Sequence, residues 1–168
     1  MIKVYEPLEY YTRKEQSGLF LAGGIDRAPD WQKNAISYLK EKYNKMNLAV
    51  LNPRRSTPFS TEDYNARTEQ VEWEFMHLRY ADAILFWFPE NAPCTTSLFE
   101  LGFWLNTSKV FIGINPGHYK ERSVKTQVDL LNKSRIGIKV VVHSTLESTV
   151  DSAVSFIKDG YRCKRRDI

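Results

Sequence analysis

The stretch "AILFWF", residues 83–88, consists entirely of apolar side chains. A short run of this kind is typical of a buried β-strand. Similar runs rich in branched or aromatic residues occur at "GLFLAG" (18–23), "LAVLNP" (48–53), "KVFIGIN" (109–115) and "IKVVVH" (138–143), and "IKVY" (2–5) is a further short candidate. The chain is therefore expected to build a sheet of roughly five buried strands.

Helical segments are expected between these strands. Their apolar residues recur three and four positions apart, and they cover residues 30–44, 62–80, 97–107, 123–133 and 145–158. Asp30, which follows Pro29, is a suitable N-cap for the first of them. Strands that alternate with helices predict an α/β fold, with a parallel sheet covered by helices on both faces. This is the three-layer, Rossmann-like sandwich.

The size and charge of the chain suit one domain. It has 168 residues, and Lys and Arg (24) exceed Asp and Glu (20) by four. We expect a single domain over residues 1–168, with residues 1–16 as an N-terminal extension and 161–168 as a basic tail. This small excess of positive charge permits an anionic partner without requiring one. Because no nucleic-acid motif is present, the tail "YRCKRRDI" is expected to be solvated and a nucleic-acid partner is not expected.

Cysteine and histidine usage points away from a metal centre. Cys94 and Cys163 are far apart and lack a CxxC partner, and the histidines do not have metal-ligand spacing. We expect no metal, no cofactor and no disulfide framework. The charged N-terminus lacks the apolar core of a signal peptide, and no apolar run is long enough to span a membrane. A cytoplasmic location is therefore expected.

The loops that follow the strands are the expected binding region, because ligands of open parallel sheets bind beyond the carboxyl ends of the strands. These loops are "AGGIDRAPDWQ" (22–32), "NPRRSTPFS" (52–60), "PENAPCTTS" (89–97) and "NPGHYKERS" (115–123). Gly23 and Gly24 either form a tight turn or let the backbone approach a phosphate. Arg54 and Arg55 either hold a phosphate or brace a surface loop. His118 is a further candidate for contact with substrate.

Two glutamates stand out as candidate catalytic groups. Glu74 comes four residues after Gln70, so both lie on one helix face, which is either solvated or functional. Glu100 lies inside "TTSLFELGFWL" (95–105). A helix that starts near residue 97 would place Glu100 in its first turn, where it either forms a capping box with Ser97 or is held ionised by the helix dipole for chemistry. Two carboxylates in one pocket suit cleavage of a glycosidic bond.

Four segments together carry a family resemblance. They are "FLAGGIDRAPDWQ" (20–32), "NPRR" (52–55), "QVEWEFMHLRYADAILFWFP" (70–89) and "SLFELGFWL" (97–105). In this order they resemble the nucleoside 2-deoxyribosyltransferase superfamily, especially its nucleoside deoxyribosyltransferase-like branch, from about residue 18 to 115. The resemblance implies a flavodoxin-like sheet and exchange of the base on a 2-deoxyribonucleoside through a glycosyl intermediate on a glutamate. It also implies a homo-oligomer.

The resemblance assigns roles to individual residues. It makes Glu100 the nucleophile and Glu74 its acidic partner. Candidate substrate-binding residues are Phe20, Gly23, Gly24, Asp26, Trp31, Gln32, Asn52, Arg54, Arg55, Gln70 and Pro89, and Trp87 either packs against a ring or belongs to the core. The chain departs from the family pattern at Phe20, often a tyrosine, and at Cys94, where an aspartate is usual. Hydrolysis of nucleoside 5′-monophosphates and a non-catalytic nucleotide-binding module are the alternatives.

Overall fold

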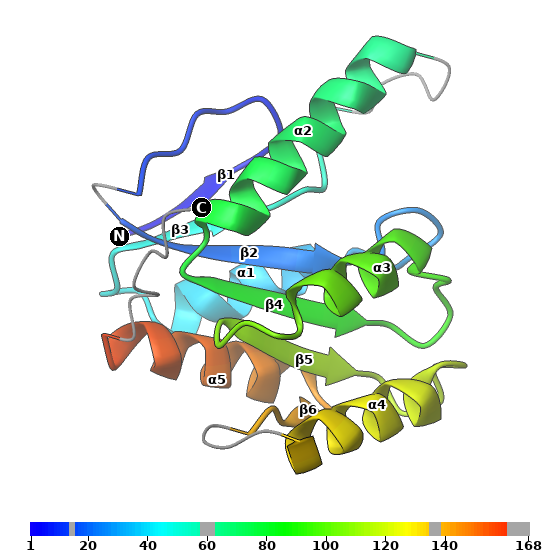
Figure 1. The fold of residues 1–168 in the computed structure, drawn as a ribbon. Helices are drawn as coiled ribbons and strands as arrows, with labels where there is room; N and C mark the ends of the chain where they lie inside the picture. Colours follow the sequence, from blue (N-terminus) through cyan, green and yellow to red (C-terminus); the bar gives the residue numbers. More distant parts are fainter. Residues whose placement is uncertain (14–15, 58–62, 135–138, 161–168) are drawn as a thin grey trace.

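The computed structural model describes residues 1–13, 16–57, 63–134 and 139–160, and these form an α/β sandwich (Figure 1). In chain order the elements are β1 (Ile2–Tyr5), β2 (Ser17–Gly23), α1 (Trp31–Lys42), β3 (Leu48–Leu51), α2 (Tyr64–Tyr80), β4 (Ala83–Phe88), α3 (Thr95–Trp104), β5 (Val110–Ile114), α4 (Glu121–Ser134), β6 (Val142–His143) and α5 (Leu146–Lys158). The predicted fold class is confirmed, and the predicted basic tail lies outside the described residues.

The sheet has six parallel strands in the order β1-β3-β2-β4-β5-β6. Without β1, the order is that of a flavodoxin-like sheet. The additional strand comes from the N-terminal "IKVY", which pairs with β3 from Ile2 opposite Leu48 to Tyr5 opposite Leu51. From β2 the chain first builds outward to β3 and then returns to the other side to build β4. The direction of growth therefore reverses between β2 and β4.

Alternate residues of the strands supply two hydrophobic cores, one on each face of the sheet. On the face covered by α2, α3 and α4, β4 contributes Ile84, Phe86 and Phe88. On the face covered by α1 and α5, it contributes Leu85 and Trp87. Every residue of β4 is buried, as expected for a central parallel strand with helices on both sides.

Side-chain caps fix the starts of three helices. Asp30, Asp63 and Thr145 each accept a hydrogen bond from the backbone N–H three residues later, which satisfies a donor that the helix itself leaves unpaired. The predicted N-cap at Asp30 is confirmed. Within the described ranges, none of the helices combines the length and apolar character needed to cross a membrane.

The predicted strand at 138–143 is wrong in extent, because only Val142 and His143 pair with β5. The reason is a side-chain clamp from the end of α4. Asn132 donates to the Val140 carbonyl (2.8 Å) and accepts from the Val140 N–H (2.9 Å). Both backbone polar groups of Val140 are thereby used, and Val141 is left 59% exposed. The strand therefore begins only after the clamp.

A buried lysine closes the C-terminal end of α2. The ammonium of Lys109 donates to the carbonyls of Leu78, Arg79 and Ala81, and it lies 4.7 Å from the centre of the Trp104 ring. The residue is only 4% exposed. The last carbonyls of a helix lack partners within the helix, and a cation there also interacts favourably with the helix dipole. Lys109 thus ties α2 to the start of β5.

We expect Lys109→Met to lower the free energy of unfolding by about 1–3 kcal/mol, because it leaves buried carbonyls without a donor. Urea denaturation followed by circular dichroism measures this loss. The control is Lys125→Met, which removes a partly exposed i,i+4 ion pair with Glu121 and should cost less than about 0.5 kcal/mol. Equal losses in the two variants would contradict the role given to Lys109.

Candidate active site

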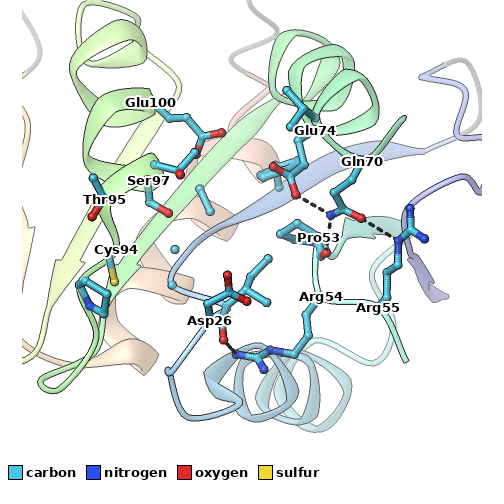
Figure 2. A pocket seen from close by; sticks show the side chains of 18 of the residues that line it. Asp26, Pro53, Arg54, Arg55, Gln70, Glu74, Cys94, Thr95, Ser97 and Glu100 are labelled. Carbon is cyan, nitrogen blue, oxygen red and sulfur yellow. Dashed lines mark hydrogen bonds between the residues drawn. The ribbon is translucent and has the colours of Figure 1, made fainter. Parts of the chain in front are cut away.

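A cavity of about 610 Å³ opens where β2 and β4 end and the growth of the sheet reverses direction. Its walls come from the end of β2, the loop after β3, one side of α2, and the loop and first turns of α3 (Figure 2). Diverging loops leave a crevice at such a point, so it is the usual binding position in sheets of this kind. The fourth predicted loop, residues 115–123, does not line the cavity.

Most of the residues predicted for the site lie together around this cavity. They are Phe20, Gly23, Gly24, Asp26, Arg54, Arg55, Gln70, Glu74 and Glu100. Phe20 is buried at the wall, where its ring lies 6.1 Å from that of Trp73 on α2. Asp26 is exposed in the loop after β2.

The other predicted binding residues, Trp31, Gln32, Asn52 and Pro89, do not line the cavity. Trp31, the first residue of α1, is 2% exposed and packs in the core between α1 and the sheet. Its indole N–H donates to the Gly24 carbonyl at 3.0 Å. Asn52 accepts from the N–H of Arg54 and donates to its carbonyl, which closes the turn after β3. These residues shape the loops that carry the cavity. Trp87 likewise belongs to the core.

Arg54 and Arg55 have different surroundings. Arg54 donates to Gln32 Oε1 and to the carbonyls of Ile25, Ala28 and Pro29, so its guanidinium holds the loop after β2 in place. Arg55 donates through Nε to Gln70 Oε1 at 2.7 Å. Arg54 thus braces a loop, which is one of the two roles considered for the arginine pair. Arg55 instead contacts α2, the helix that carries Glu74.

Glu74 and Gln70 lie on the same face of α2, as their spacing predicts. Gln70 Nε2 donates to Glu74 Oε1 at 2.5 Å. Glu74 is half-buried, and burial raises the pKa of its carboxyl group. The Gln70 hydrogen bond and the Arg55 charge partly oppose this rise, and the Asp26 charge adds to it. Glu74 lines the cavity, so of the two interpretations of this helix face the structure supports the functional one.

Helix α3 begins earlier than predicted, which removes the capping box. Its first residue is Thr95 and its N-cap is Cys94, which has left-handed backbone angles (φ 48°, ψ 35°) and makes no side-chain cap bond. Ser97 therefore lies in the first turn and Glu100 in the second. A side chain one turn further along is beyond the strong effect of the helix dipole.

The two carboxylates point into the cavity from opposite sides, Glu74 from α2 and Glu100 from α3 (Figure 2). Burial raises the pKa of Glu100 to about 8, and the charge of Glu74 adds to this rise. Neither the helix start nor these surroundings support the expectation that the helix dipole holds Glu100 ionised. Burial and a like charge both disfavour the anion, as occurs where two acids share one site.

Gly24 allows the two loops beside the cavity to meet. A Cβ atom at Gly24 would lie 2.7 Å from Cys94 Sγ, closer than real Cβ contacts. A Cβ atom at Gly23 would lie 2.3 Å from the Trp87 carbonyl oxygen. This close packing leaves no room for a side chain at either glycine. Cys94 is a buried thiol, and burial raises its pKa.

Sequence reasoning missed several lining residues, including Arg67, Val71 and Ser97. Helical periodicity could have found the first two, because Arg67, Gln70, Val71 and Glu74 follow one stripe of α2. Ser97 is 6% exposed, lines the cavity from the first turn of α3, and makes no hydrogen bond through its side chain with any residue that the structure describes. The predicted helix start at residue 97 made Ser97 a capping residue, so the sequence did not indicate that it lines the cavity.

The histidines and acids do not form a metal site in the described parts of the chain, where no group of three or more potential ligands converges. His118 does not line the cavity. Its Nε2 lies 3.1 Å from the Ala92 carbonyl, and its Nδ1 accepts from the Lys120 N–H at 3.1 Å. It thus braces the loop before α3, and the prediction that it touches substrate finds no support in this geometry.

We expect Glu100→Gln to stabilise the protein at alkaline pH. A carboxyl group with a raised pKa lowers stability as pH rises from its ordinary 4.5 to about 8, since the unfolded chain releases the proton first. The amide lacks this loss, so the gain should grow across this range to at least about 1 kcal/mol. Thermal unfolding at several pH values measures it. Glu72→Gln, at an exposed position on α2, is the control, and a pH-independent effect of Glu100→Gln would contradict the burial argument.

One of the comparisons with known proteins gives a family match. The family model described as "Nucleoside 2-deoxyribosyltransferase like" matches residues 16–118, more than half of the chain. The matched segment runs from the start of β2 past the end of β5, and it contains every residue that lines the cavity. None of the curated proteins compared with the chain matches it. The match over residues 16–118 establishes that the chain belongs to the nucleoside 2-deoxyribosyltransferase-like family.

Proposed function

We propose that this protein is an enzyme that acts on the N-glycosidic bond of (deoxy)nucleosides and transfers the 2-deoxyribosyl group from one base to another. The observation that carries the proposal is the pair of half-buried carboxylates, Glu74 and Glu100, on opposite walls of the cavity at the β2–β4 switch point. Two acids at such a site match the needs of glycosidic chemistry, in which one forms the bond to carbon and one moves the proton.

In the proposed reaction a carboxylate oxygen of Glu100 attacks C1′ of the sugar. The C1′–N bond breaks, its electron pair remains on the base nitrogen, and the base takes up a proton. The new C1′–O bond makes the sugar an ester of Glu100. In the second half, a nitrogen of the incoming base attacks C1′ and releases Glu100, and the proton of that base returns to the carboxylate pair.

The proton that the leaving base needs is held by the pair itself. With the pKa of Glu100 raised to about 8, Glu100 carries a proton in the free enzyme near neutral pH and must lose it to attack. Glu74 is the nearby group that accepts this proton and passes it to the base. A general acid at this position is useful because a neutral base leaves far more readily than its anion.

The cavity provides different surfaces for the two parts of a nucleoside. Phe20 and Val71 form apolar surface against which a flat base can pack. Asp26, at the rim, has carboxylate oxygens that accept hydrogen bonds from sugar hydroxyls. Whether a base or water is the acceptor decides between transfer and hydrolysis.

Hydrolysis of a nucleoside 5′-monophosphate is the second candidate, and the start of α3 favours it. This helix has no side-chain cap, and no acidic residue occupies its first turn. Its first turn and the side chain of Ser97 border the cavity. Free N–H groups at a helix N-terminus attract anions, so a 5′-phosphate has a place to bind there.

We expect turnover to depend on Glu100. Incubation with deoxynucleosides and their 5′-monophosphates, each with and without a second base, should release or exchange the base, as measured by chromatography. Glu100→Ala should lower kcat at least about a thousandfold, as expected when a nucleophile is removed. Glu72→Gln is the control at an exposed glutamate. Unchanged turnover in Glu100→Ala would contradict its role, and ligand-induced thermal stabilisation without any wild-type turnover would favour the binding-module alternative.

Release only from monophosphates, with no exchange, would identify the hydrolase. In that case Ser97→Ala should raise KM for the monophosphate about tenfold, because one hydrogen bond to a charged group is lost. Exchange between unphosphorylated nucleosides would identify the transferase.

We also propose that the protein forms a homo-oligomer, as the family resemblance implies. An exposed apolar face on α2 and α3 starts at the cavity edge with Val71 (62% exposed) and includes Phe75 (48%), Phe99 (77%) and Phe103 (62%). Each helix contributes two of these residues four positions apart, so they form one stripe per helix. A second copy of the chain is the occupant that we assign to this face.

Light scattering after size exclusion should therefore give a mass of at least two chains. Phe99→Ser combined with Phe103→Ser should shift it to that of one chain, because burial of large apolar side chains drives association. Leu130→Ser, at an exposed position on α4, is the control. A single-chain mass for the wild type would contradict the oligomer.

A further inference from the structure

A chain of hydrogen bonds crosses one wall of the cavity and ends on Glu74 (Figure 2). Arg55 Nε donates to Gln70 Oε1 at 2.7 Å. The other end of the same amide, Gln70 Nε2, donates to the Pro53 carbonyl at 2.9 Å and to Glu74 Oε1 at 2.5 Å. The loop after β3 is thereby connected to a carboxylate that lies about three turns along α2.

These partners allow only one orientation of the Gln70 amide. Arg55 is a donor and therefore needs the amide oxygen, whereas the Pro53 carbonyl and the Glu74 carboxylate are acceptors and need the amide N–H groups. Both N–H groups are used in this arrangement. Gln70 was a candidate to bind base or sugar, but it has no N–H left for a ligand while these bonds hold.

The carboxylate pair is supported unequally. Glu74 accepts from Gln70 and lies near the Arg55 charge, and both favour its anion. Glu100 makes no hydrogen bond with any residue in the described ranges, and its surroundings offer burial and the charge of Glu74. The first negative charge of the pair therefore belongs on Glu74.

We propose that Gln70 is a positioning residue, which directs the negative charge of the pair to Glu74 and leaves the proton on Glu100, with Arg55 fixing the direction of its amide. The effect of this arrangement on catalysis rests on the proposed function. An ionised and oriented Glu74 accepts the Glu100 proton as Glu100 attacks C1′ and then donates it to the departing base nitrogen. The location of the proton in the free protein can be tested whether or not the protein shows turnover.

The charged groups that face Glu74 come from every neighbouring element. Asp26 in the loop after β2 and Glu100 on α3 are negative, whereas Arg55 after β3 and Arg67 on α2 are positive, and all four line the same cavity. Gln70→Leu leaves these four charges in place and adds none, so it reports on the hydrogen bond.

The test is a pH titration of the glutamate side-chain carboxyl carbons by NMR, with Glu74→Gln and Glu100→Gln used to assign the signals. In Gln70→Leu, which cannot donate, we expect the Glu74 pKa to rise by about one unit and the Glu100 pKa to fall, because the charge moves between them. Gln127→Leu, at an exposed position on α4, should leave both unchanged. Unchanged pKa values in Gln70→Leu would overturn the proposal, even if the wild type proves inactive.

Gln70→Glu provides a second variant of the same size, in case the leucine variant fails to fold. It keeps an acceptor for Arg55 and, when ionised, replaces the donor to Glu74 with a like charge, so the Glu74 pKa should rise further. In an active enzyme both variants should lower kcat at least about tenfold, with little change in KM for the incoming base. A raised KM with unchanged kcat and unchanged carboxyl pKa values would instead identify Gln70 as a base-binding residue and overturn the proposal.

Discussion

The pairing of β2 with β4 is the constraint on which the rest of the structure depends. Both strands are buried on both faces, so they must lie at the centre of the sheet with helices above and below. Because the chain builds outward from β2 in one direction and from β4 in the other, the loops that follow them diverge. That divergence creates the cavity, and α2 and α3 then place one glutamate on each of its walls.

The two carboxyl groups of the site lower the stability of the fold when they are ionised. Two half-buried carboxyl groups line one cavity, and their pKa values rise because burial is not fully offset by nearby donors and positive charge. Only Glu74 has a hydrogen-bond donor among the described residues that stabilises its charge. That donor is Gln70, whose amide oxygen accepts a hydrogen bond from Arg55. An uneven arrangement of this kind makes two chemically identical side chains differ in acidity, and the proposed function uses that difference to give them separate roles.

Much of the fold could be predicted because it follows from local patterns. Apolar runs identified the central strands, and Asp30 marked the start of α1. The failures came from local features that apolar periodicity does not encode, namely a side-chain bond to the backbone and a left-handed residue. The clamp from Asn132 shortens β6, and the left-handed Cys94 starts α3 two residues before the position that "TTS" suggests. Spacing on one helix paired Glu74 with Gln70, but only the packing of α2, α3 and the loop after β3 around one cavity relates them to Glu100 and Arg55.

The clamped segment before β6 also affects whether the edge of the sheet can pair with a strand of another protein molecule. An exposed strand edge is a row of unpaired backbone groups that can recruit a strand from another chain and begin aggregation. Here the outermost strand on that side pairs over only two residues, and Asn132 occupies the backbone of Val140 just before it. A single asparagine therefore makes this edge a poor template for a foreign strand, which protects a sheet whose interior is almost entirely apolar.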